Sequence, residues 1–168
     1  MQSDTLCASM VAALLIVAAL HDMAFRTVPN YMAATLAIVG LSFRALSGQL
    51  LFAIIASSIV FAGGAWLWRR GWMGGGDVKL VGATALAMAP IQIPSMLMAT
   101  SLAGGVLALP YLITRGRPSM AHAPTGRRPN TLIGRILRVE RRRLRQGGPL
   151  PYAVAIAAGA IFILFQGG

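Results

Sequence analysis

Long apolar stretches alternate with short polar connections along the chain. The apolar stretches lie at about 5–21, 31–47, 50–68, 78–98, 96–114 and 150–165. A helix needs about 20 apolar residues to cross roughly 30 Å of hydrocarbon, and these stretches approach or reach that length. The fourth and fifth stretches run together around Pro90 and Pro94. We therefore predict an all-α integral membrane protein, a bundle of about six transmembrane helices.

Composition supports a single membrane domain. Apolar residues make up 57% of the chain and charged residues only 11%, which is more apolar than a soluble core requires. Six spans and their connections use nearly all 168 residues, so we expect one polytopic domain over residues 1–168. The run from Leu6 to Leu20 is short enough for a secretory signal. Its leading segment has Asp4 and no basic residue, and no cleavage site follows before Asp22, so we interpret it as a retained first helix.

The basic residues predict the orientation of the helices. Alternate connections are basic, and ten arginines lie between residues 115 and 145. Fourteen of the fifteen Lys and Arg residues then fall on one side, and only Arg44 lies opposite. Because basic loops stay in the cytoplasm, we expect both termini to be extracytoplasmic. Three tryptophans at the end of the third stretch are typical of an interfacial belt: Trp66, Trp68 and Trp72.

The net charge of +11 comes largely from a basic connection at about 115–149, between the fifth and sixth stretches. In a membrane protein such a loop satisfies the positive-inside rule and binds anionic lipids, each basic residue contributing about 1 kcal/mol near the surface. We therefore expect no nucleic-acid partner. Within it, residues 131–145 alternate apolar residues with arginines, which predicts a basic amphipathic helix in the headgroups.

No metal or cofactor site is expected. Cys7 is the only cysteine, so one chain forms no disulfide and no thiolate zinc site. His21 and His122 are far apart and lack ligand neighbours at metal-binding spacing, apart from Asp22 beside His21. The chain contains neither a P-loop nor a dinucleotide fingerprint.

The acidic residues are few: Asp4, Asp22, Asp77 and Glu140. Asp4 stands near the chain end and Glu140 among arginines, so both are interpreted as solvated charges. Asp22 closes a run of about 17 apolar residues, which places it just inside the cytoplasmic interface. Only about 20 to 25 Å of helix follows Asp77 before the prolines. We therefore expect the glycine-rich loop before Asp77 to dip into the membrane, where irregular backbone must be buried or line a wet cavity.

Two interpretations of these carboxylates remain open from the residues alone. Asp22 and Arg26 are four residues apart and form a plausible interfacial ion pair. Alternatively, Asp22 and Asp77 converge and share one proton, because two like charges do not ionise together cheaply. Such a pair activates water with one carboxylate while the other donates a proton. Glycines 74–76 would then adopt positive φ angles and allow close approach of another backbone.

Three motifs connect these residues to a known family. Gly74, Gly75, Gly76 and Asp77 form a G-x-G-D motif, which continues with Val78, Lys79 and Leu80. Asp22 is followed at fixed spacing by Arg26, Val28, Pro29 and Asn30. The third is the C-terminal LPYAVAIAAGA, residues 150–160. In these motifs the chain resembles the type IV prepilin peptidases, six-helix membrane aspartyl proteases of the G-x-G-D type.

The resemblance implies a function and a site. Its catalytic residues would be Asp22 and Asp77, supported by a second group of motif residues: Gly74, Gly76, Lys79, Arg26, Pro29 and Asn30. It implies removal of leader peptides from prepilin or pseudopilin substrates at the cytoplasmic face of a bacterial inner membrane, without a metal. Larger members carry an N-terminal domain with paired cysteines that accompanies methylation. This chain lacks it and is similar in size to the short peptidases of tight-adherence (Flp) pili, so we expect a peptidase without methyltransferase activity, its substrate and oligomeric state left open.

Two other classes of protein remain possible. A small proton- or cation-coupled carrier also uses broken helices and buried carboxylates, but it needs them near the midplane with access from both sides. Here both aspartates adjoin cytoplasmic basic residues. A non-catalytic scaffold for pilus assembly is the third class, and it would tolerate the loss of either aspartate.

Overall fold

The computed structural model describes residues 2–114 and 152–166. Within these ranges the chain forms six α-helices and one short 3-10 helix: α1 (Gln2–Phe25), α2 (Asn30–Leu46), α3 (Leu50–Arg69), α4 (Gly75–Ala87), η1 (Pro90–Gln92), α5 (Ile93–Thr114) and α7 (Tyr152–Gln166). The predicted all-α fold class and its six helices are confirmed. The basic connection at about 115–149, with the amphipathic helix expected at 131–145, lies outside the described residues.

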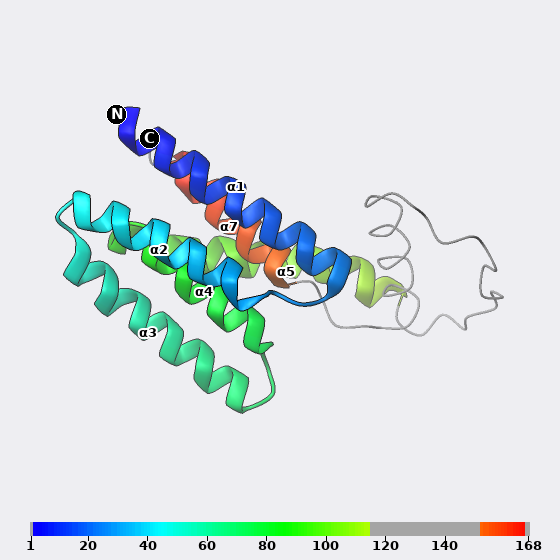
Figure 1. Cartoon of the computed structure of the whole chain (residues 1–168). Coiled ribbons are helices and arrows are strands. Elements are labelled where there is room, and N and C mark those ends of the chain that lie inside the picture. The colour runs from blue at the N-terminus through cyan, green and yellow to red at the C-terminus, as the bar shows by residue number, and fades with distance from the viewer. Residues whose placement is uncertain (1, 115–151, 167–168) are drawn as a thin grey trace.

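Helix α4 occupies the centre of the bundle. It packs against α2, α3 and α7, while α7 also lies beside α1 and α5 (Figure 1). The end of α1, the start of α2, the end of α3 and the start of α4 all lie at one end of the bundle. Asp22 and Asp77 are therefore carried to the same end. Helix α1 begins and α7 ends at the opposite end (Figure 1).

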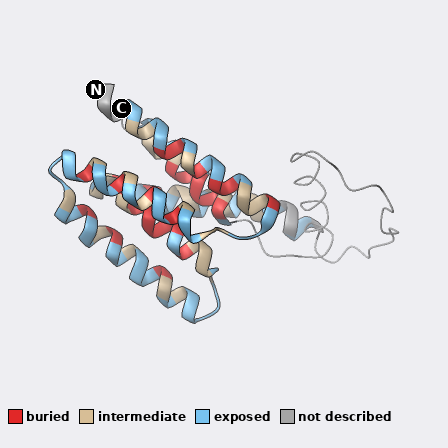
Figure 2. Cartoon of the chain, viewed as in Figure 1, coloured by how far each residue is buried: buried red, intermediate tan, exposed pale blue. Residues whose placement is uncertain are grey.

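The distribution of side-chain size is that of a membrane protein. Three of the described helical segments are long and apolar enough to cross a bilayer: Thr5–Phe25, Leu50–Arg69 and Pro90–Leu109. Helices α2 and α7 are apolar but shorter. The buried positions are rich in alanine, and many large apolar residues are exposed. Helix α3, for example, is exposed along much of its length (Figure 2). Small residues at helix contacts and large apolar residues outside are the pattern expected in lipid.

The boundary between the fourth and fifth helices lies at the first of the two prolines, before the end of the fourth apolar stretch. The hydropathy pattern extended the fourth stretch over 78–98, whereas α4 ends at Ala87. Ala89 is extended, with φ −64° and ψ 139°, because the residue before a proline avoids the helical region. Pro90 then opens η1, and Pro94 stands at the second position of α5, where a helix tolerates proline. Helix α4 is thus 13 residues and about 20 Å long.

Helix α4 contacts its neighbours where one partner is glycine. A Cβ atom added at Gly40 of α2 would lie 2.7 Å from the Ala87 Cα, and one at Gly82 would lie 2.9 Å from the Phe61 ring of α3. Such small residues allow helix axes to approach closely and pack by van der Waals contact. The position of α4, and with it that of Asp77, is therefore set by close contacts on two sides.

Candidate active site at the ends of α1 and α4

Asp22 lies in the last turn of α1 and is half-buried. The helix ends three residues later, and Arg26 adopts a left-handed conformation with φ 61°. The Arg26 backbone N–H donates to the Asp22 carbonyl oxygen at 2.7 Å, which closes the end of the helix. His21 Nδ1 lies 2.8 Å from the Thr27 carbonyl oxygen, a second contact between the last turn and the following link.

The link from Arg26 to Pro29 carries the chain directly into α2. Val28 is half-buried and packs against the hydrophobic core. Pro29 is extended, with φ −61° and ψ 146°, and its carbonyl oxygen accepts the Met32 backbone N–H at 3.1 Å in the first turn of α2. A proline at this point holds φ near the value that a helix start requires. The Asp22 segment and α2 are thus joined by a short, well-packed link.

The glycine-rich segment, which we expected to be a loop, forms the start of a helix. Gly75 and Gly76 are the first residues of α4, and Gly74 before them has φ −70° and ψ 141°. The positive φ angles expected here are absent: the glycines with positive φ in the described ranges are Gly48 and Gly71. The reason for glycine at 74–76 is therefore space and not backbone conformation.

Each of the three glycines faces a different neighbour. A Cβ atom at Gly74 would lie 2.7 Å from Asp77 Oδ2, and one at Gly76 would lie 3.3 Å from the Val28 Cβ. A Cβ atom at Gly75 would lie 3.2 Å from Trp68 Nε1. The glycines thus let the Asp77 carboxylate fold back over the start of α4, and bring that start against the α1–α2 link and α3.

Asp77 is the third residue of α4, half-buried and ahead of the apolar stretch 78–98, outside the three candidate spans. Burial and then the charge of Asp22 raise the pKa of Asp77 from 3.8 to about 6, while a hydrogen bond from the Gly74 backbone lowers it. A side chain that reaches back from the third helical residue to the residue before the helix is half of a capping box. The charge of Asp22 therefore opposes the ionisation of Asp77, as expected for two carboxylates at the same end of the bundle.

Two more residues of the predicted site meet beside the aspartates. Lys79 Nζ donates to Asn30 Oδ1 at 2.8 Å, so the second turn of α4 is joined to the first residue of α2. Lys79 and Asn30 are 49 positions apart in the sequence and exposed at the same end of the bundle. The side chains expected to support the site are thus partly assembled: Lys79 with Asn30, and Gly76 with Val28. Arg26 and Pro29 contribute through the backbone of the link.

Sequence reasoning missed one contributor and undervalued another. Trp68 was interpreted only as part of an interfacial belt, yet its indole lies over Gly75 while 55% of its surface is exposed. Val28 was noted as part of a motif but not as the residue that meets Gly76. Trp68 lies close to the glycines in the sequence, separated from them by the short 70–74 connection. That closeness is the signal from which the contact could have been predicted.

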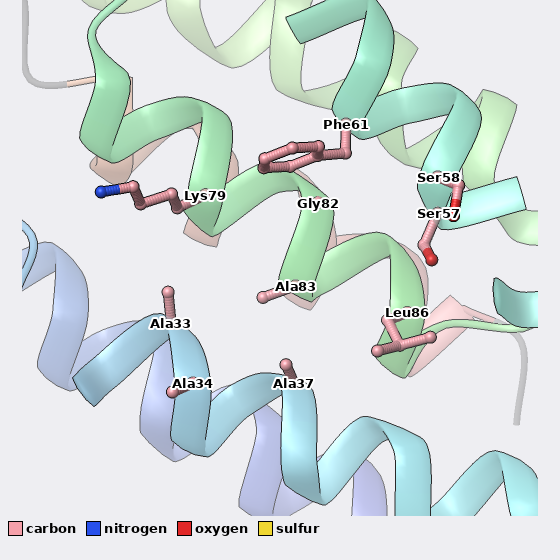
Figure 3. A pocket seen from close by; sticks show the side chains of 10 residues that line it. All are labelled: Ala33, Ala34, Ala37, Ser57, Ser58, Phe61, Lys79, Gly82, Ala83 and Leu86. Atoms are coloured by element: carbon pink, nitrogen blue, oxygen red, sulfur yellow. The ribbon is translucent and has the colours of Figure 1, made fainter. Parts of the chain in front are cut away.

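A groove opens beside the site between α2 and α3, with α4 as its floor (Figure 3). Its volume is about 400 Å³, and its walls are mainly small or apolar side chains: Ala33, Ala34 and Ala37 of α2, Ser57, Ser58 and Phe61 of α3, and Gly82, Ala83 and Leu86 of α4. Lys79 stands at the end of the groove nearest the aspartates, with its amine directed away from the floor (Figure 3).

The ligand sets for metals are sparse in the described residues. No group of three or more His, Cys, Asp and Glu side chains is placed there to hold a metal ion. His122 and Glu140 lie outside the described residues.

Comparison with known proteins supports the family resemblance. The model of the type IV leader peptidase family matches residues 9–109, which is more than half of the chain and includes both aspartate motifs. Comparisons with curated proteins and with solved structures returned no match.

Proposed function

Because the chain belongs to the type IV leader peptidase family, we propose that it is an aspartyl endopeptidase that removes leader peptides from type IV prepilin-like substrates. The observation that carries the proposal is that Asp22 and Asp77, two half-buried carboxylates on different helices, lie at the same end of the bundle, where the charge of Asp22 contributes to the raised pKa of Asp77. The family establishes a leader peptidase, and the pair of carboxylates supplies a chemistry for it.

The proposed mechanism uses one proton shared by the pair. In the singly protonated pair, Asp22 is the ionised partner and accepts a proton from a water molecule, whose oxygen attacks the carbonyl carbon of the scissile peptide bond. Asp77, whose pKa is raised to about 6, holds the shared proton and donates it to the carbonyl oxygen. When the C–N bond breaks, Asp22 passes the proton taken from water to the leaving nitrogen, and Asp77 recovers its proton from a hydroxyl group of the intermediate, so the pair ends as it began. The apparent pKa values of such a pair belong to both groups together.

The charge distribution supports cleavage at the cytoplasmic face of a bacterial inner membrane. The two aspartates share their end of the bundle with four basic residues, Arg26, Arg69, Arg70 and Lys79, and Arg44 stands at the other end. Under the positive-inside rule this end faces the cytoplasm. Prepilin substrates carry their leader on that side, ahead of an apolar helix, and the basic surface would bind anionic lipid around them.

The test is leader removal in membranes that contain equal amounts of each variant. Candidate prepilins are co-expressed with the unaltered chain, Asp22→Asn, Asp77→Asn and Asp4→Asn, and processing is followed by the shift in substrate size. Asparagine preserves size and hydrogen bonding but removes the titratable carboxylate. We expect normal cleavage with Asp4→Asn and none with the other two. Substantial cleavage by Asp22→Asn or Asp77→Asn would exclude the two-aspartate mechanism, whereas no cleavage by the unaltered chain would favour a scaffold or carrier.

A further inference from the structure

Arg44 is a buried charged residue that the proposed chemistry does not use. It stands in the last turn of α2, at the end of the bundle opposite Asp77, and only 8% of its surface is exposed. In the topology predicted from the sequence, Arg44 is the one basic residue on the extracytoplasmic side, which the positive-inside rule disfavours. A charge held inside a membrane bundle is costly unless it has hydrogen-bonding partners.

The partner of Arg44 is the end of α4. Its Nη2 and Nε atoms donate to the Ala87 carbonyl oxygen at 3.1 and 3.3 Å, and Nη1 donates to Gln49 Oε1 at 3.3 Å. The guanidinium also lies 4.7 Å from the centre of the Phe43 ring. Helix α4 stops at Ala87, so this carbonyl has no N–H group from a following turn. The planar guanidinium of Arg44 supplies the missing donors, because two of its N–H groups point to the Ala87 carbonyl oxygen.

A second contact with α2, at Gly40, also fixes the position of Ala87. Gly40 lies one turn before Arg44 on α2, and a Cβ atom there would fall 2.7 Å from the Ala87 Cα. Gly40 thus sets how closely α2 and α4 approach, and the guanidinium sets how far α4 is displaced along its axis. At the other end of the same helix pair, Asn30 of α2 accepts a hydrogen bond from Lys79 of α4.

Helix α2 therefore determines how the segment that carries Asp22 and the helix that carries Asp77 are placed relative to each other. Its first residue follows the short link from Asp22, and its sides are joined to α4 near both ends, at Lys79 and at Ala87. A displacement of α4 along α2 would move Asp77 relative to Asp22 and separate Gly76 from Val28. We propose that Arg44 is a positioning residue, which holds the axial register of α4 so that Asp77 meets Asp22 at the opposite end of the bundle. The inference rests on the proposed function.

The first measurement does not depend on activity. Val28→Cys and Gly76→Cys are introduced together in a Cys7→Ser background. A Cβ atom added at Gly76 would lie 3.3 Å from the Val28 Cβ atom, near the 3.5 to 4.5 Å between Cβ atoms that is typical of disulfides. Cross-linking under mild oxidation reports the register at the aspartate end. We expect rapid cross-linking in this chain, a several-fold lower rate with Arg44→Met added, and an intermediate rate with Arg44→Lys. Leu46→Ala, an exposed change in the same turn, should leave the rate unchanged.

The second measurement is leader cleavage by the same Arg44 and Leu46 variants without the added cysteines, per molecule of folded protein in detergent. A misplacement of about 1 Å costs up to about 100-fold in rate, so we expect kcat to fall 10- to 100-fold with Arg44→Met while KM stays within about 2-fold. Arg44→Lys should recover part of kcat. Unchanged cross-linking and unchanged kcat in Arg44→Met would overturn the inference, as would a loss of folded protein with normal kcat per folded molecule.

The two proposals fail in different ways. If the unaltered chain cleaves no prepilin, the proposed function fails, and the cross-linking rate still decides whether Arg44 sets the register. If the unaltered chain cleaves and Asp77→Asn does not, while Arg44→Met behaves as the unaltered chain in both measurements, the function stands and the positioning role is refuted.

Discussion

Replacing Gly74 by alanine tests how the start of α4 controls the ionisation of Asp77. The backbone at Gly74, φ −70° and ψ 141°, is one that alanine adopts without strain. The new Cβ atom would stand 2.7 Å from Asp77 Oδ2, 0.7 Å short of the 3.4 Å at which ordinary van der Waals contact begins. The carboxylate must therefore turn away and lose the hydrogen bond from the Gly74 backbone.

The size and sign of the effect follow from that lost hydrogen bond. A hydrogen bond to a charged group contributes about 1.5 to 3 kcal/mol, and one pKa unit corresponds to about 1.4 kcal/mol. Asp77 is only partly buried, and solvent weakens the interaction, so we expect a shift of about half to one unit. The hydrogen bond stabilises the ionised form, so its loss raises the pKa of Asp77 above about 6. Asp77 then keeps its proton to higher pH.

The assay is the pH dependence of leader cleavage by purified protein in lipid nanodiscs. If Asp77 is the proton donor, the alkaline limb of the profile should move up by about half to one pH unit in Gly74→Ala. Gly63→Ala is the matched control, because a Cβ atom there has no neighbour within 4 Å. An alkaline limb that stays in place, or moves to lower pH, would refute the assignment of the hydrogen bond and of the donor.

Three further predictions concern the same end of the bundle. Gly76→Val should abolish cleavage, since even a single Cβ atom there lies 3.3 Å from the Val28 Cβ, and normal processing by it would show that this contact is dispensable. Asp77→Asn should raise the unfolding temperature in detergent more at pH 7.5 than at pH 4, because a raised carboxyl pKa destabilises the folded chain as pH rises through about 6; an equal effect at both pH values would contradict this. Cysteine replacing Arg70 should resist an impermeant label in intact cells while one replacing Ser47 reacts, and the reverse labelling would invert the topology.

The helices were predictable because membrane helices leave a strong sequence signal. Long apolar runs predicted all six, and the ends of α2 and α3 fall within one or two residues of the expected ones. The end of α4 was predicted only as far as the two prolines, because hydropathy does not mark it within the stretch 78–98: the break is made by backbone preferences before Pro90. Pro94, the other proline at which the helix could have ended, instead lies in the first turn of α5.

The site was only partly predictable. Asp22 and Asp77 stood out because acids are rare in an apolar chain, and their motifs supplied the supporting residues. The role of the glycines was predicted in part: glycines 74–76 closely approach their neighbours, as expected, but none has a positive φ, and the two uses of glycine look the same in a sequence. The contact of Arg44 with Ala87 joins residues 43 positions apart, and no local pattern reports it.

The left-handed backbone at Arg26 implies a conflict between stability and chemistry in this link. A residue with a Cβ atom adopts that conformation at a cost of about 1 to 2 kcal/mol, and glycine is the usual occupant of the position after a helix. A glycine here would relax the chain and delete the guanidinium. The arginine places a positive charge one residue beyond the helix that carries Asp22, at a conformational cost that glycine would avoid. Stability of the link and a charge beside Asp22 therefore favour different residues at the same position.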